Sequence, residues 1–209
     1  MRVFHIGTDQ FVELDVLPEA LPAAGFVWIG SARREFEVNV ADIQARLQAW
    51  GCGQLVDLHV SDLLNQQLPS NFDSTSWYDL LVFRRLAIGN GGEALMADDA
   101  LATPAAARKA LASIDTSPVG FAVFDRVLLT VHPANCAVRE HFAQRLLQQG
   151  SGSGVESRAA SRLPPSPADL MLRMANHMVD SYLALRRLLT RQLGTLQSEL
   201  LDPKSRFGD

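Results

Sequence analysis

The sequence has 209 residues, of which 47% are hydrophobic and 20% are charged, and its formal net charge is -4. This composition excludes a fibrous or wholly disordered chain. The longest apolar runs are far shorter than the roughly 20 residues that cross a bilayer, and the negative charge argues against nucleic acid as a partner. With no paired cysteine motif and no signal segment, we expect a reducing cytosol as the compartment.

The first fifty residues predict strands followed by a helix. Segments 3–6 and 11–16 flank a polar turn and predict a hairpin. Segment 26–30 is continuously apolar, as in a strand that is buried on both faces. Apolar residues then recur at helical spacing until Gly51, which predicts an amphipathic helix with a glycine C-cap; they are Val40, Ile43, Leu47 and Trp50.

The middle of the chain gives weaker patterns. A short helix is expected through residues 61–64 and is ended by Pro69. Aromatic and branched residues over 77–87 predict an interior strand. Residues 93–117 are rich in alanine, and we expect at most a weak helix near 103–111.

The later segments predict a second hairpin and two helices. Apolar runs at 119–124 and 127–131 are joined by two polar residues, so we expect a hairpin placed centrally in a sheet. Residues 135–149 fit a helix. An apolar stripe then predicts one long amphipathic helix, or two helices that meet at Gly194; it contains Leu170, Met174, Met178, Tyr182, Leu185, Leu189, Leu193, Leu196 and Leu200.

These elements predict the α/β class, with a mixed central sheet sandwiched between helical layers and a long C-terminal helical element. We expect an α/β domain over 1–150 and a Gly/Ser/Pro-rich flexible linker over 151–167. The long helix or helix pair over 168–203 is expected to pack on the domain, with part of its stripe facing a partner.

Three common catalytic and cofactor-binding motifs are absent from the sequence. The dinucleotide fingerprint fails because Val56 stands where the third glycine should follow Gly51 and Gly53. A phosphate loop and a nucleophile elbow are also absent, so we expect no enzyme. Cys52 and Cys136 are interpreted as small buried residues rather than reactive thiols.

Two helical pairs of possible metal ligands remain. His59 and Asp62 lie three residues apart at the expected start of a short helix, and His177 and Asp180 have the same spacing on the long helix. Each pair could face one ion. The alternative is a helix cap by Ser61 or Asp62 in the first case and a solvated helix surface in the second.

Four blocks of sequence resemble the cytoplasmic domain of the CorA-type magnesium transporters. The blocks are HVSDLLN (59–65), WYDLLVFRRLA (77–87), VGFAVFDRVLLTVHP (119–133) and DLMLRMANHMVDSYLALRRLLTRQLGTLQSELLDP (169–203). The third block contains the Leu-x-Thr-Val strand of the family, and the fourth contains its Val-Asp-x-Tyr centre. Val60 replaces the usual Pro and Ser61 the usual Glu of the first block.

The resemblance implies a function in ion transport. The chain would be the regulatory, ion-sensing domain of a longer membrane protein, at the cytoplasmic face of the plasma membrane and water-soluble as a fragment. Its stalk helix, two membrane helices and Gly-Met-Asn signature would follow Pro203. The full-length protein would be a homopentamer that transports Mg²⁺, and regulatory Mg²⁺ between subunits would favour the closed state.

The resemblance also implies individual residue roles. Asp62 matches the interfacial carboxylate of the family, and its usual partner lies on the stalk helix, so Asp62 is the one expected metal ligand. Asp180 would orient the long helix, while Thr130 and His132 would pack rather than act in catalysis. Two alternatives stay open: a zinc or other divalent-metal transporter of the same superfamily, and a free-standing interaction module that binds a helical partner through its apolar stripe.

Overall fold

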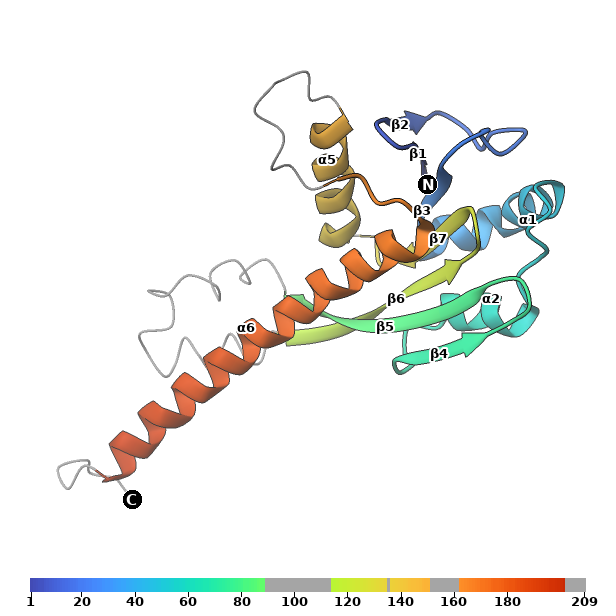
Figure 1. The fold of residues 1–209 in the computed structure, drawn as a ribbon. Coiled ribbons are helices and arrows are strands. Elements are labelled where there is room, and N and C mark those ends of the chain that lie inside the picture. The colour runs from blue at the N-terminus through green and yellow to red at the C-terminus, as the bar shows by residue number, and fades with distance from the viewer. Residues whose placement is uncertain (89–113, 135, 151–161, 202–209) are drawn as a thin grey trace, which may run out of the picture. The chain divides into compact units, whose positions relative to one another are not determined.

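The computed structural model describes residues 1–88, 114–134, 136–150 and 162–201. Its strands form one seven-stranded sheet in the order β2-β1-β3-β7-β6-β5-β4 (Figure 1). The strands are β1 (Arg2–Ile6), β2 (Phe11–Leu14), β3 (Phe26–Ala32), β4 (Asn71–Ser74), β5 (Asp79–Ile88), β6 (Ile114–Val123) and β7 (Val127–His132). The described helices are α1 (Arg33–Ala49), α2 (Asp57–Leu64), α5 (Ala137–Gly150) and α6 (Pro167–Leu201).

The sheet is mixed, as the sequence predicts. Strands β3 and β7 run parallel at its centre, with Ile29 opposite Leu129. The β1–β2 and β6–β7 pairs are the two expected antiparallel hairpins. All seven residues of β3 and all six of β7 are buried, because both faces of these strands are covered.

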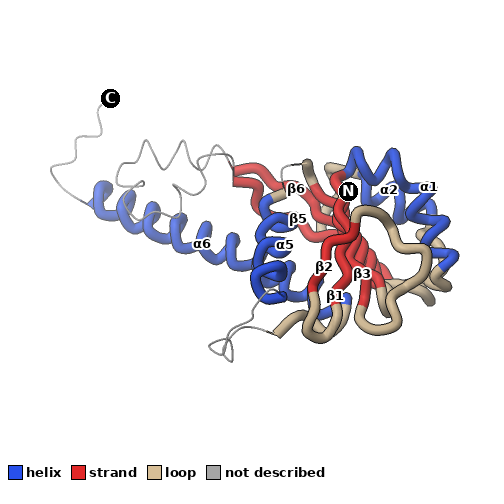
Figure 2. Tube along the Cα trace, turned by 90° about the horizontal axis from the view of Figure 1, so that it is seen from above, coloured by secondary structure: helices blue, strands red, loops and turns tan. Residues whose placement is uncertain are grey.

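Helices cover both faces of the sheet. Val27 and Ile29 of β3 point to one face, where they join a core cluster that includes Phe36 of α1 and Leu63 of α2. Trp28 points to the opposite face, on which α5 lies. Figure 2 shows α1 and α2 on one side of the sheet and α5 on the other. The α/β class with helical layers is therefore confirmed.

Helix α1 is longer than its apolar pattern predicts. It begins at Arg33 rather than near Val40, because its polar first turns are joined directly to β3 and bury Phe36. Its expected end is confirmed, since Gly51 adopts a φ of 73° directly after the last turn.

Three features of the middle of the chain differ from the expectation. Helix α2 begins at Asp57, four residues before the expected start. Strand β4 was not predicted, and it consists of four exposed residues that pair with β5. Residues 114–117, which fell in the alanine-rich stretch, belong to β6. The expected weak helix near 103–111 lies outside the described residues.

Helix α6 is a single helix that continues through Gly194, so the alternative of two helices is excluded. Its start is fixed by Ser166, whose hydroxyl oxygen accepts the backbone N–H of Asp169 at 3.2 Å. Pro167 occupies the first helical position. Residues 151–161 of the expected linker lie outside the described residues, and Pro164 of its described part is buried.

The chain divides into two compact units, Met1–Arg84 with Ser117–His177, and Arg85–Thr116 with Met178–Asp209. In the first unit, Leu170 and Met174 of α6 are buried. In the second unit, the stripe of α6 becomes exposed, with Leu189 at 41% and Leu193 at 66% of their accessible surface. Within the described part of the chain, none of the helices is both long and apolar enough to cross a membrane.

Candidate metal-binding site

Asp62, the expected metal ligand, is half-buried on α2. Its side chain makes no hydrogen bond or ion pair with any described residue. Because α2 begins at Asp57, the expectation that Asp62 caps the start of this helix is wrong. Asp62 instead lies near the C-terminal end, where its charge opposes the helix dipole. The local structure therefore provides no stabilising role for this carboxylate.

His59, one turn before Asp62, has a different environment. It is 4% exposed, and both ring nitrogens have partners. Its Nε2–H donates to Oδ2 of Asp73 at 3.0 Å, and its Nδ1 lies 2.7 Å from the hydroxyl of Tyr78. The same hydroxyl accepts the backbone N–H of Val56 at 3.0 Å. In the neutral ring, Nδ1 accordingly accepts the proton of Tyr78.

The surroundings of His59 also shift the pKa values of Asp73 and Tyr78. The hydrogen bond from His59 lowers the pKa of Asp73, and burial raises the pKa of Tyr78. A metal could bind His59 only if one of its two hydrogen bonds broke. The structure therefore does not bring His59 and Asp62 together as a pair of ligands, and the described residues contain no cluster of three or more potential metal ligands.

His177 contacts another histidine. Its ring stacks on that of His141 of α5, with centroids 4.5 Å apart and planes 12° apart, and meets the ring of Phe142 edge-on. Asp180 follows three residues later on α6 and is exposed. His141 is the partner of His177 that sequence spacing could not indicate, because 36 residues separate the two.

The remaining expected packing residues are buried. Thr130 is 2% exposed, and its hydroxyl oxygen accepts the indole N–H of Trp28 at 3.1 Å. Cys136 is also buried. Cys52 is half-buried, and burial raises the pKa of its thiol, so the reactive thiolate is disfavoured.

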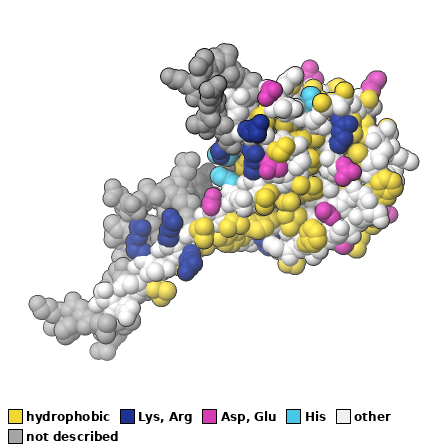
Figure 3. All heavy atoms as spheres, viewed as in Figure 1, with side chains coloured by type: hydrophobic (Ala, Val, Ile, Leu, Met, Phe, Trp, Pro, Cys, Tyr) yellow, Lys and Arg dark blue, Asp and Glu magenta, His cyan; other side chains and the backbone are white. Residues whose placement is uncertain are grey.

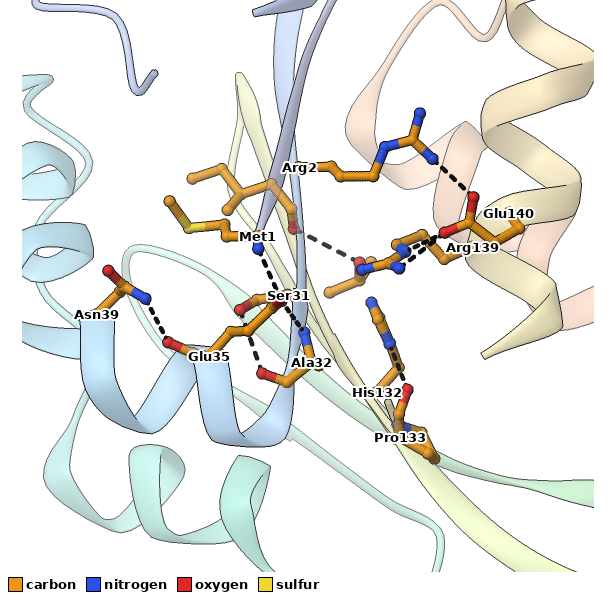
Figure 4. Close-up of polar contacts among 12 residues, drawn as sticks. Met1, Arg2, Ser31, Ala32, Glu35, Asn39, His132, Pro133, Arg139 and Glu140 are labelled. Carbon is orange, nitrogen blue, oxygen red and sulfur yellow. Dashed lines mark hydrogen bonds and ion pairs between the residues drawn. The ribbon is translucent and has the colours of Figure 1, made fainter. Parts of the chain in front are cut away.

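A polar network that the sequence did not predict lies where the parallel strands β3 and β7 end (Figure 4). Glu140 of α5 binds Arg2 and Arg139, with distances of 2.8 and 2.7 Å. Glu35 of α1 binds the terminal amino group at 2.8 Å and the N–H of Ala32 at 2.9 Å. The contact with the amino group lowers the pKa of Glu35. The network thus ties β1 to both helical layers.

His132 lies at the same end of β7 and is 1% exposed. Its Nδ1–H donates to the carbonyl oxygen of Pro133 at 2.8 Å. Burial lowers the pKa of His132 to about 4, so the ring is neutral at pH 7. The expected packing role therefore agrees with its environment.

Several solved structures are similar to this chain. The CorA magnesium transporter from Methanocaldococcus jannaschii matches with a TM-score of 0.61 at 14% identity, over 96% of this chain and 51% of that protein. Full-length CmaX matches with a TM-score of 0.60 at 16% identity, over 99% of this chain and 53% of that protein. The ZntB cytoplasmic domain from Vibrio parahaemolyticus RIMD 2210633 matches with a TM-score of 0.50 at 14% identity, over 96% of this chain and 63% of that chain. No family model matches the sequence, and no curated protein matches it.

The chain has the CorA soluble-domain fold. The soluble domain of CorA from Methanocaldococcus jannaschii matches over 95% of this chain with a TM-score of 0.59. The chain spans about half the length of full-length CorA and CmaX.

Proposed function

We propose that the chain is the cytoplasmic regulatory domain of a CorA-type transporter that carries divalent cations, Mg²⁺ foremost. The main support is a fold match over nearly the whole chain to about half of two longer proteins, one of them a magnesium transporter. The sequence also lacks the dinucleotide fingerprint, the phosphate loop and the nucleophile elbow.

Asp62 is the proposed regulatory ligand. Its carboxylate is partly accessible, is unpaired among the described residues, and lies at the end of α2 that disfavours negative charge. A nearby cation would relieve this unfavourable interaction. Mg²⁺ takes oxygen ligands, keeps several waters and needs only one or two carboxylates from each surface. One partly accessible aspartate per subunit therefore suffices if a second subunit supplies the other ligand.

The ion would act through subunit packing. Carboxylates that face each other across an interface repel until a cation neutralises them, so Mg²⁺ favours the packed, closed pentamer by mass action. When the Mg²⁺ concentration falls, the packed arrangement loses this stabilisation, and the transporter opens.

Helix α6 is the proposed connection to the rest of the transporter. Its exposed Leu189 and Leu193 leave part of the apolar stripe available for a partner. Figure 3 shows arginine side chains gathered along the same helix, and Arg186, Arg187 and Arg191 line one surface of it. Both features fit a helix that continues into an assembly.

The test uses the full-length protein and limited proteolysis at increasing Mg²⁺ concentration. Mg²⁺ is expected to protect the native protein, and Asp62→Ala is expected to weaken that protection. Asp42→Ala removes an exposed carboxylate of α1 and serves as the matched control. Unchanged protection in Asp62→Ala would remove Asp62 from the regulatory site.

The same proteolysis experiment with Zn²⁺ distinguishes a magnesium transporter from a zinc transporter. If Zn²⁺ protects at much lower concentration than Mg²⁺, and if replacement of His177 abolishes this effect, the zinc transporter is favoured. His59 is a weaker candidate because both of its nitrogens are hydrogen-bonded.

Without the stalk, the 209-residue chain is not expected to remain pentameric at low concentration, and a stable pentamer in light scattering would contradict this expectation.

A further inference from the structure

A pocket of about 350 Å³ lies where several loops of the first unit meet. Its walls come from the β2–β3 loop, the end of α1, the β4–β5 turn and the β6–β7 turn. Three aromatic residues line it, Trp50, Trp77 and Phe124, together with the charged residues Asp125 and Arg126. The proposed regulatory function uses none of these residues.

Trp77 is held in place although 61% of its surface is exposed. Its ring lies against the backbone of Gly53, where a Cβ atom would come within 2.9 Å of the ring atom Cδ2. The backbone N–H of Trp77 donates to the hydroxyl oxygen of Thr75 at 3.1 Å, and that hydroxyl donates to the backbone carbonyl oxygen of Tyr78 at 2.8 Å. The turn thus presents a large aromatic surface that needs little ordering on binding.

The two charged residues of the pocket differ in their hydrogen bonding. Arg126 donates to the carbonyl oxygen of Gly25 through Nε at 3.2 Å and through a terminal nitrogen at 3.1 Å, and it also contacts the carbonyl of Pro22. Asp125 is exposed, and its carboxylate has no hydrogen bond or ion pair to any residue that the structure describes. The negative charge is therefore the one left for a ligand.

The pKa of the Cys52 thiol is also affected by these two charges. Burial is the main cause of its raised pKa, and the charge of Asp125 raises it further. Arg126 acts in the opposite direction but is the smaller influence. At the position of this thiol, the charge of Asp125 therefore outweighs that of Arg126.

We propose that this pocket binds a small organic ammonium ion. The negative faces of aromatic rings attract such cations, and tryptophan is the most effective of the three aromatic residue types. Asp125 supplies the counter-charge, and the ring surfaces accept the alkyl groups that surround the nitrogen. The proposal rests on the pocket alone and is independent of the proposed role in ion transport.

The test follows the indole N–H signals of the 209-residue chain by NMR. Choline is the probe, and its uncharged isostere, in which carbon replaces the ammonium nitrogen, is the matched control ligand. Choline is expected to shift the signals of Trp50 and Trp77 saturably. The signal of Trp28 should stay in place, because this residue is fully buried and donates to Thr130. The isostere should bind at least about threefold more weakly.

Variants test the pocket residues. Asp125→Asn and Trp77→Ala should each weaken choline binding about threefold or more. Phe72→Ala, which removes an aromatic residue that is 63% exposed and lies outside the pocket, should leave binding unchanged. The proposal is overturned if choline gives no saturable shift, if the isostere binds equally well, or if Asp125→Asn and Phe72→Ala have equal effects. Asp125→Asn keeps the size and turn preference of the residue, so its effect can be separated from unfolding.

Discussion

Nε2 of His59 lies 3.0 Å from Oδ2 of Asp73, and this hydrogen bond joins α2 to the edge strand β4. All four residues of β4 are exposed, so the strand has little apolar burial of its own. Its position depends on pairing with β5 and on this contact. His59 of the HVSDLLN block is therefore a structural residue, whereas Asp62 of the same block makes no hydrogen bond or ion pair with the residues that the structure describes.

Tyr78→Phe tests the role of the His59 network. Loss of the hydroxyl leaves Nδ1 of buried His59 and the N–H of Val56 without their partner. We expect a loss of about 1–3 kcal/mol in the free energy of unfolding, measured by urea denaturation. Asp73→Asn is the milder control, because the amide oxygen can still accept from His59 at this exposed position. Equal stability of Tyr78→Phe and the native chain would contradict the assignment.

His132 predicts a pH-dependent stability. Its pKa is about 4 in the folded chain, against an ordinary value of 6.5. The unfolded state therefore binds an additional proton between these values, and stability falls as the pH decreases from 6.5 to 4. The contribution is about 1.4 kcal/mol per pH unit, or about 3 kcal/mol in total, and is fully present above pH 6.5.

NMR titration of the histidine rings measures this pKa directly. His132→Gln should remove the corresponding part of the pH dependence whatever its effect on stability at neutral pH. His5→Gln is the control, because His5 is only half-buried in the β1–β2 hairpin. A ring of His132 that titrates near its ordinary value would refute the expected dependence.

Asp62→Lys should have opposite effects on stability and on ion sensing. A positive charge near the C-terminal end of α2 interacts favourably with the helix dipole, so we expect a gain of about 0.3–1 kcal/mol without divalent ions, measured by urea denaturation. In the full-length protein, the same variant should lose protection by Mg²⁺. A clear loss of stability would instead indicate that Asp62 has a structural role.

Gly53→Ala and Gly51→Ala separate backbone strain from crowding. Both residues have positive φ, at 76° and 73°, so each alanine should cost about 1–2 kcal/mol in unfolding free energy. A Cβ at Gly53 would also collide with Trp77, whereas a Cβ at Gly51 has open space. Gly53→Ala should therefore be the more destabilising of the two in thermal unfolding, and the difference should shrink in a Trp77→Ala background.

Periodicity predicts those elements whose apolar residues are covered within the domain. The buried run of β3 and the stripe of α1 are examples, since side-chain alternation and helical spacing directly reflect burial. Strand β4 could not be predicted, because its exposed residues Asn71–Ser74 carry no apolar pattern and become a strand only by pairing with β5.

The site could be predicted only in part. The resemblance selected Asp62, but sequence spacing grouped it with His59, whose partners Asp73 and Tyr78 are brought close by tertiary structure. The aromatic pocket was missed for the same reason: Trp50, Trp77 and Phe124 come from three separate segments of the chain. Contacts between distant segments leave no periodic signal in one sequence.

The most direct measurement for the central claim is the reading frame of the natural gene downstream of the codon for Asp209. The proposed regulatory role predicts that the frame continues into a stalk helix and then two apolar membrane-spanning segments. A stop codon immediately after Asp209 would contradict it and would favour an independent interaction module instead.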